Sequence, residues 1–293
     1  MKQLIKNIYE QYYKLLLILS LLLVVASIGV LIVQYVNTGE VIQRGVSLKG
    51  GITLTIQAEK EIAMSELQTS LSNAFPKGDI SVRLLTEGGK TKAFIIEAAD
   101  VEADALINSL KGKEFSMKEG TYSVESMGSS LGAKFFNQVI WSLLVAFIFM
   151  SIVVFITFRS IVPSSFVILA AVSDIVSSAA VVSLLGVKIS TAGIAAFLML
   201  IGYSVDTDIL LTTRVLRRSG GTVVSRIYNA MGTGILMSGT SLVASLIAYF
   251  FSHSDVIKQI TLIISLGMLF DIVYTWIQNA GILRWYLERK GIR

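Results

Sequence analysis

Residues Leu15–Val36 read LLLILSLLLVVASIGVLIVQYV, a run without a single charged side chain. At a rise of about 1.5 Å per residue, such a run forms an α-helix roughly 33 Å long, enough to cross the hydrocarbon core of a bilayer. The apolar part of a secretory signal peptide is shorter, about 7–15 residues, and is followed by small residues. Because this run ends in VQYV, we expect an uncleaved first transmembrane helix.

Five more apolar runs follow, and each is long enough to span the membrane. They lie at Phe135–Phe158, Val162–Leu185, Ile189–Leu211, Ala230–Phe251 and Gln259–Ile282. The composition agrees, because only 15% of the residues are charged, against about 25% in an ordinary soluble domain. The sequence therefore predicts an α-helical polytopic membrane protein with six transmembrane helices.

Residues 37–133 differ from the rest, since they mix charges of both signs with short apolar stretches and contain no run that spans a membrane. Their periodicity predicts alternating strands and helices. The expected strands are Val46–Gln57, Ile80–Leu85, Ala93–Ala98 and Thr121–Met127, and the expected helices are Met64–Phe75 and Val101–Lys111, with a hairpin turn at Glu87–Lys90. The order βαββαβ predicts a ferredoxin-like α+β domain between transmembrane helices one and two.

Orientation follows from the basic residues of the short loops, which mark the cytoplasmic side. The loop between the fourth and fifth spans contains four arginines, whereas the opposite short loops contain only two lysines. The arginines are Arg214, Arg217, Arg218 and Arg226. No aromatic residues suited to base stacking are interleaved with them, so they indicate topology, and contact with membrane lipid second, rather than nucleic-acid binding. We expect both termini in the cytoplasm and residues 37–133 outside the cell membrane.

These predictions divide the chain into the cytoplasmic N-terminus with helix one (1–36), the extracytoplasmic domain (37–133), a five-helix transmembrane bundle (134–285) and a cytoplasmic tail (286–293). The chain has no cysteine and a single histidine, so it offers neither a thiolate nucleophile nor a metal site with several His or Cys ligands. It also lacks a Ser/His/Asp combination and a P-loop. We predict no enzyme, no cofactor and no metal site.

Acids within membrane spans are costly and therefore informative. Four fall within or near the apolar runs: Asp174, Asp206, Asp208 and Asp271. Asp206 is the strongest candidate for a proton relay, because Gly202, one turn earlier on the same face, lets a helix or water approach it. Burial in the bundle would raise its pKa towards neutrality. Asp206 and Asp208 lie about 200° apart around the helix, so they cannot both face one partner.

Each acid also has a structural interpretation. Neighbouring Ser and Thr hydroxyls can hold Asp206, and Asp208 lies about one turn from the arginine loop, near the membrane interface. Asp174 and Asp271 fit the role of hydrogen-bond acceptors between packed helices. In the fifth span, Gly232, Gly234 and Gly239 predict close helix packing.

Three motifs resemble the SecF-type subunits of the SecDF protein-export complexes. The segment VSLKGGITL (46–54) looks like the family's Gly-Gly strand; a lone Gly-Gly pair by itself indicates a bulge or a close backbone approach. The segment IGYSVD (201–206), followed by Arg214, looks like the helix-four signature shared by SecD and SecF. The segment MSGTS (237–241) resembles the family's helix-five stretch. Together with the order of one helix, one domain and five helices, they cover nearly the whole chain.

The resemblance implies a subunit that pairs with SecD beside the SecY-containing channel, within a helical arrangement like that of the RND superfamily. It implies use of the proton gradient to promote export of a translocating preprotein, with Asp206 as the ionisable residue. This sequence has Thr233 where bacterial members have an arginine linked to proton coupling, and Thr207 where they place the acid. Both departures indicate an archaeal-type member.

Two other functions stay open at this stage. The chain fits half of an RND-type exporter for lipids or small molecules, although its single small external domain leaves little room for a substrate pocket. It also fits a scaffold subunit without energy coupling, which Thr233 favours. A SecD-like partner chain distinguishes export from efflux, and neutralising Asp206 distinguishes coupling from a scaffold.

Overall fold

The computed structural model describes residues 2–57, 64–76, 78–87, 90–111, 121–217, 221–252 and 254–291, which form two compact units. The helical unit comprises residues 1–43, 142–187 and 192–293, and the sheet unit comprises residues 44–141 and 188–191. Helix α5 contributes residues to both units, and so does α7, whose first residue, Thr191, belongs to the sheet unit.

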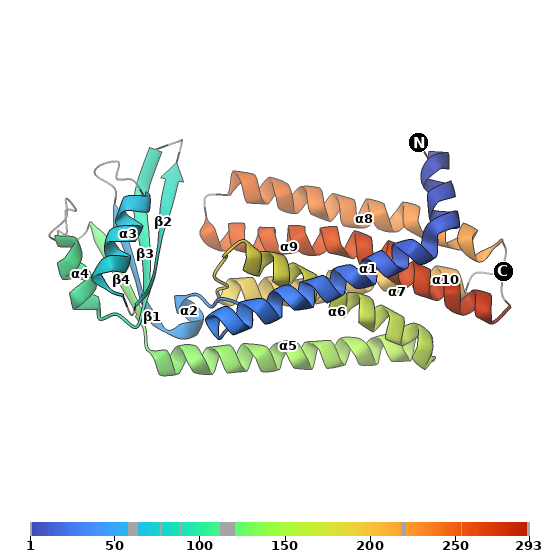
Figure 1. Cartoon of the computed structure of the whole chain (residues 1–293), viewed down its shortest axis with the longest axis horizontal. Helices are drawn as coiled ribbons and strands as arrows, with labels where there is room; N and C mark the ends of the chain where they lie inside the picture. The colour runs from blue at the N-terminus through green and yellow to red at the C-terminus, as the bar shows by residue number, and fades with distance from the viewer. Residues whose placement is uncertain are drawn as a thin grey trace. The chain divides into compact units, whose positions relative to one another are not determined.

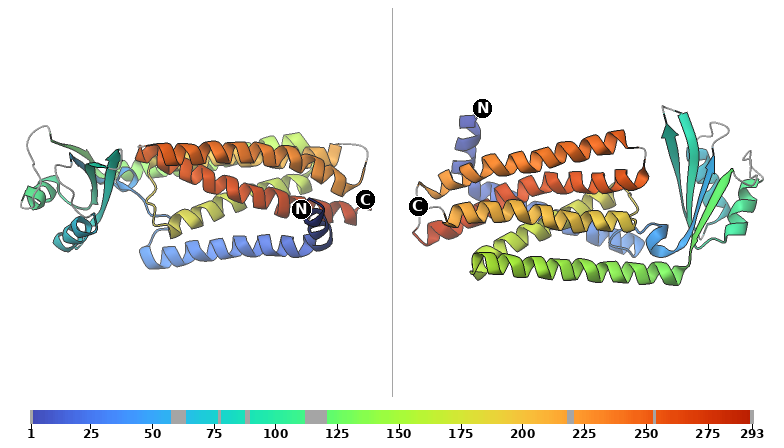
Figure 2. Two further views of the ribbon diagram at one scale, coloured as in Figure 1. Left: turned by 90° about the horizontal axis from the view of Figure 1, so that it is seen from above. Right: turned by 180° about the vertical axis from the view of Figure 1, so that it is seen from behind.

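Long helices that run side by side make up the helical unit (Figures 1 and 2). They are α1 (Lys2–Thr38), α5 (Ser129–Phe158), α6 (Ile161–Leu184), α7 (Thr191–Arg217), α8 (Val223–Phe251), α9 (Asp255–Val273), the π-helical turn η1 (Tyr274–Asn279) and α10 (Ala280–Arg289). Six segments of the described chain are long and apolar enough to cross a membrane, and the last of them, Val256–Arg289, contains most of α9 with η1 and α10. The prediction of a multi-span helical protein is confirmed.

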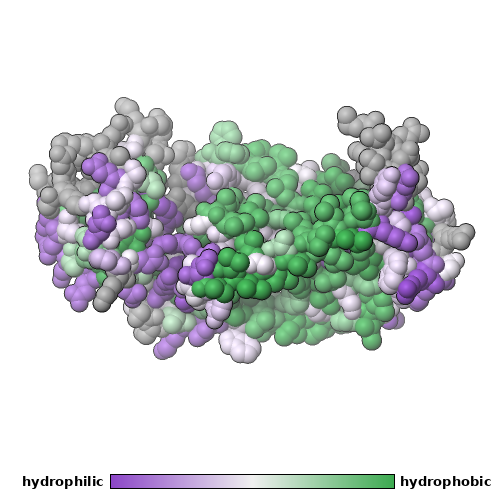
Figure 3. All heavy atoms as spheres, in the orientation of Figure 1, coloured by the Kyte–Doolittle hydropathy of each residue, from purple (hydrophilic) through white to green (hydrophobic). Residues whose placement is uncertain are grey.

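The helices of the helical unit fall into an inner and an outer group according to how much of each helix is buried. Helices α6 and α7 and the last span are largely buried, whereas α1, α5 and α8 expose most of their apolar side chains. Figure 3 shows this hydrophobic band along the helices, with hydrophilic residues gathered near the end where α10 stops. At that end, the Tyr13 hydroxyl of α1 donates to Glu288 of α10 over 2.6 Å. Apolar side chains exposed along a membrane span are typical of a helix that faces lipid or another helix.

The sheet unit begins with a single helical turn, α2 (Val46–Lys49), and continues as four strands and two further helices. These are β1 (Gly51–Gln57), α3 (Met64–Ala74), β2 (Asp79–Glu87), β3 (Lys90–Ala99), α4 (Ala103–Lys111) and β4 (Tyr122–Met127). The sheet order is β2-β3-β1-β4, and every pair is antiparallel. The predicted hairpin has the expected strands, paired up to Glu87 and Lys90, while its tip, Gly88–Gly89, lies outside the described residues.

One predicted strand is wrong at its start. Residues 46–49 form the helical turn α2 instead of extending β1, because Gly50, with φ +85°, redirects the backbone between turn and strand. Gly51 follows with φ +138° and approaches the backbone of strand β3 closely. The expectation of a close backbone approach at this glycine pair is therefore confirmed.

The core of the sheet unit lies on one face of the sheet. In β1, every second residue is buried, and these side chains pack against α3 and α4, which cover the same face (Figures 1 and 2). The core residues from these three elements are Ile52, Leu54, Ile56, Leu67, Leu71, Leu106 and Leu110. The period of two in the strand and the helical spacing of the leucines together produce this arrangement.

We expect a Gly51→Ala substitution to destabilise the sheet unit by about 1–3 kcal/mol, because L residues rarely adopt its backbone conformation. The added Cβ would also overlap the carbonyl oxygen of Ala98. Limited proteolysis of membrane vesicles at rising temperature measures the effect. Gly128→Ala is the matched control, because a Cβ there would have no described atom within 4 Å. Equal melting of the two variants would contradict the prediction.

Candidate functional site

A cluster of polar side chains is buried inside the helical unit, between α6, α7, α9 and η1. Three of its members are acids, Asp174 on α6, Asp208 on α7 and Asp271 on α9, and none of them has exposed surface. Acids in membrane spans are rare because their charged forms are costly away from water. We call the three acids and their hydrogen-bond partners the carboxyl cluster.

Asp271 lies at a junction of three elements. Its carboxylate accepts hydrogen bonds from the Thr207 hydroxyl of α7 at 2.7 Å, the Ser238 hydroxyl of α8 at 2.8 Å and the Thr275 hydroxyl of η1 at 3.0 Å. All four side chains are buried. Both oxygens of Asp271 are thus occupied, and the carboxylate joins α7, α8 and the last span.

Asp174 and Asp208 each have only one occupied oxygen. The Ser204 hydroxyl donates to Asp174 Oδ2, and the Asn279 amide donates to Asp208 Oδ1 over 2.7 Å. No described donor reaches Asp174 Oδ1 or Asp208 Oδ2.

Several buried oxygen atoms in this region have no hydrogen-bond donor among the described residues. Besides the two carboxylate oxygens, the side-chain carbonyl oxygens of Gln278 and Asn279 are buried without a described donor. The ion pairs found among the described residues involve none of the three cluster acids. A buried acceptor without a donor is destabilising, and a bound proton relieves it, since a protonated carboxyl becomes a donor. The arrangement can therefore accommodate a proton on one of the carboxyls.

Further polar contacts extend from the cluster towards α1. The Gln278 amide donates to the Ser173 hydroxyl over 3.1 Å, and the Tyr274 and Ser177 hydroxyls lie 2.6 Å apart. Ser177 in turn accepts from Ser27 of α1 over 3.0 Å. Over the part of the chain that the structure describes, no group of three or more His, Cys, Asp or Glu side chains is placed to hold a metal ion.

Asp206 lies outside this cluster, although it was the strongest candidate from the sequence. Its side chain is exposed on α7, as are its neighbours Gly202 and Tyr203, so the helices of this chain do not bury it. Asp208 points to the opposite side and is fully buried inside the bundle. The two acids lie on different faces of α7, as predicted, but Asp208 faces the interior of the bundle and Asp206 faces outward.

Thr233 contacts the arginine loop region rather than the carboxyl cluster. Its hydroxyl accepts from Arg214 Nη1 over 2.8 Å, and the same nitrogen donates to the backbone carbonyl of Asn229 over 2.7 Å. The structure therefore joins two residues that the sequence had singled out separately, and it ties the end of α7 to the start of α8.

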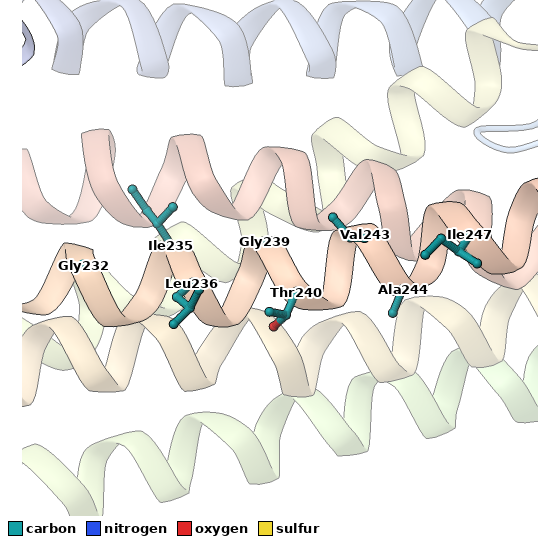
Figure 4. A pocket seen from close by; sticks show the side chains of 8 residues that line it. All are labelled: Gly232, Ile235, Leu236, Gly239, Thr240, Val243, Ala244 and Ile247. Atoms are coloured by element: carbon teal, nitrogen blue, oxygen red, sulfur yellow. The ribbon is translucent and has the colours of Figure 1, made fainter. Parts of the chain in front are cut away.

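The four glycines predicted for helix packing fall into two groups. A Cβ at Gly234 would overlap the indole of Trp276, so this glycine lets α8 approach the last span. At Gly202, Gly232 and Gly239, a Cβ would meet no described atom within 4 Å. The last two line a shallow groove of about 660 Å³ on the outer face of α8, together with Leu236 and Val243 (Figure 4).

Sequence reasoning left Asp271 and its hydroxyl partners out of the site. A signal was present in the spacing, because Asp271, Thr275, Gln278 and Asn279 recur at helical intervals through an apolar run. Ser204, Thr207 and Asp208 do the same on α7. Each set is a polar stripe on one helix face, and the structure brings the two stripes together.

Comparison with known proteins gives one family. Residues 108–289 match the family described as "Protein export membrane protein SecD/SecF, C-terminal". The chain is 38% identical to the protein-export membrane protein SecF of Methanothermobacter thermautotrophicus, over 98% of this chain and 97% of that one. It is 35% identical to the SecF of Pyrococcus furiosus, over 99% and 96% of the two chains.

Two solved structures share the fold. The crystal structure of SecDF from Thermus thermophilus, described as a translocon-associated membrane protein, matches with a TM-score of 0.74 at 20% identity. The match covers 94% of this chain and 38% of that longer one. A second SecDF crystal structure, in a super-membrane-facing form, matches with a TM-score of 0.57 at 21% identity and 39% coverage of its chain.

Proposed function

Because this chain belongs to the SecD/SecF family of protein-export membrane proteins, we propose that it is an accessory subunit of Sec protein translocation that promotes export of preproteins. In this role it works beside a SecY-containing channel and pairs with a SecD chain. The names of its relatives support export as the process. The proposal requires no enzymatic step and no cofactor.

The exposed carboxyl of Asp206 carries the proposed pairing. Asp206 lies near the middle of a membrane span, yet the helices of this chain leave it uncovered. Exposing an acid to lipid at that depth costs about 2.5–3.5 kcal/mol on insertion scales. A second helical chain that covers α7 removes this cost. The chain also spans only 38% of the SecDF protein that it resembles, which leaves room for a SecD-like half.

Proton coupling is the second part of the proposal. Asp174 and Asp208 offer buried, unmatched oxygens inside the bundle, and Asp206 offers a carboxyl at the face that a partner covers. Proton uptake in the cluster changes hydrogen bonds that join α6, α7 and η1. Thr233, which Arg214 holds, takes part indirectly by fixing the ends of α7 and α8.

The sheet unit fits the proposed extracytoplasmic domain. Its sheet order, β2-β3-β1-β4, supports a ferredoxin-like fold for residues 37–133, between the first two transmembrane helices. The arginines of the loop after α7 and the basic tail support cytoplasmic termini in a multi-pass protein of the cell membrane. In this orientation, the sheet unit handles the emerging preprotein, and the exposed apolar helices contact lipid.

Pulse-chase export of a signal-bearing protein tests the function. We expect slower export in cells that carry Asp206→Asn, with unchanged membrane levels of the chain, because the variant removes an ionisable group from the partner-facing surface. Cells without the chain give the full effect for comparison. If deletion slows export and Asp206→Asn does not, Asp206 has no part in coupling and the subunit is a scaffold in that respect. If deletion itself has no effect, the export function fails.

A further inference from the structure

The short segment between α6 and α7, Lys188–Thr191, belongs to the sheet unit. Ile189 forms a parallel bridge with Arg44, and the Gly45 amide donates to the Ile189 carbonyl over 2.8 Å. The Thr191 amide donates to the Ser47 hydroxyl over 3.3 Å, and the Ile189 side chain is buried. Backbone contacts thus fasten this segment, which we call the strap, along the base of the sheet.

Charge reinforces the same contact. Asp79, the first residue of β2, binds Lys188 Nζ of the strap at 2.5 Å and Lys49 Nζ of α2 at 3.1 Å. Burial alone would raise the pKa of Asp79, but the two lysines outweigh it and hold the pKa below its usual value. The carboxylate is therefore ionised at neutral pH and links the strap to α2. Its side chain is 40% exposed, so solvent screens the attraction.

The base to which the strap is attached is closely packed. A Cβ at Gly132, near the start of α5, would overlap the amide nitrogen of Gly50. The Arg44 guanidinium lies 4.7 Å from the centroid of the Phe136 ring, also on α5. A Cβ at Gly45 would lie 3.4 Å from the Ile189 carbonyl oxygen. The strap, residues 44–50 and the start of α5 consequently form one interlocked piece.

We propose that the strap is a mechanical coupler, which passes displacement of α7 to the sheet unit, and that Asp79 is the residue that positions it. Helix α7 begins at Thr191, inside the strap, and it carries Ser204, Thr207 and Asp208 of the carboxyl cluster. A helix transmits axial displacement along its length because its backbone hydrogen bonds run along its axis. The role of this displacement in export rests on the proposed function, whereas the strap contact itself does not.

Introduced cysteines report the contact directly, since the natural chain has none. The Ser47→Cys and Thr191→Cys pair, in the full chain in membrane vesicles, should form a disulfide under mild oxidation. Adding Lys188→Glu should lower the disulfide yield at least several-fold, because two carboxylates then repel each other. Exchanging all three charges, with Asp79→Lys, Lys49→Glu and Lys188→Glu together, should restore the yield. Asp104→Lys, on the exposed side of α4, is the matched control and should leave it unchanged.

Export kinetics in a chain without the cysteines complete the test. Lys188→Glu should slow export at normal membrane levels, and the charge exchange should recover it. If Lys188→Glu leaves the disulfide yield unchanged, the ion pair between Asp79 and Lys188 does not position the strap. If Asp206→Asn slows export and Lys188→Glu does not, the strap does not couple α7 to the sheet unit. The proposed function in export stands in that case. If deletion of the chain leaves export unchanged, the proposed function fails, and the disulfide yields still decide the strap.

Discussion

An Asp271→Asn variant should reach the membrane at the normal level and yet slow preprotein export nearly as much as loss of the whole chain. Asp271 accepts three hydroxyl hydrogen bonds that join α7, α8 and η1. Asparagine has nearly the same shape but can neither bind nor release a proton, so the variant removes the ionisable group at this junction while Asp174 and Asp208 stay ionisable. Pulse-chase export, with immunoblotting of membranes, measures both quantities.

The choice of asparagine separates function from folding. A leucine would leave the Thr207, Ser238 and Thr275 hydroxyls without their acceptor, at about 1–3 kcal/mol for each buried group. Ser245→Ala is the matched control, because it removes a buried hydroxyl pair with Ser265 elsewhere in the bundle. It should cost about 1 kcal/mol and leave export unchanged. Normal export in Asp271→Asn would show that coupling does not depend on the ionisation of Asp271.

The second large effect concerns assembly. Gly239→Trp should abolish copurification of the SecD-like partner while the chain itself stays folded. A side chain at Gly239 meets no described atom of this chain within 4 Å, so the indole projects into the groove on α8. Small residues on a membrane helix permit close approach of another helix, and an indole prevents it. Affinity purification in mild detergent, followed by quantification of the partner, measures the loss.

A control for general perturbation is available on α1. Leu22 is 58% exposed on the apolar surface of α1, so Leu22→Trp adds the same indole to another exposed apolar helix face. We expect it to retain the partner in full. Equal recovery of the partner with Gly239→Trp would show that α8 lies outside the interface, and the covering of Asp206 would then have to come from contacts made by α7 alone.

The architecture was largely predictable because it depends on patterns within single segments. Each membrane span is a long apolar run, and the alternation of β1 and the leucine spacing of α3 reflect one buried face. The turn α2 was missed because Val46 and Leu48 alternate as in a strand, whereas Gly45 and Gly50 define a helical turn only in their folded conformation. The local pattern of apolar residues predicted the correct element wherever that element is a long apolar span or buries a single face.

The site was only partly predictable, because burial of a polar residue depends on which helices meet. The angular separation of Asp206 and Asp208 follows from helix geometry alone. The acid that faces inward is determined by the elements packed against α7, because its inward face contacts Asp174 of α6 and Asn279 of the last span. A motif drew attention to Asp206, and Asp271, which belongs to no recognised motif, received less weight than its hydrogen bonds justify.

The π-helical turn η1 also constrains how this sequence can change over generations. Its wider winding includes Thr275, which bonds Asp271, and ends at Asn279, which bonds Asp208. Deleting one residue here would leave an apolar segment of nearly the same length but would convert the π-helical winding into an α-helical one and change the faces on which the residues of the turn lie. Thr275 and Asn279 would then not both keep their carboxylate partners. Single-residue insertions and deletions should therefore be tolerated in the loops of this lineage and eliminated by selection between Asp271 and Asn279.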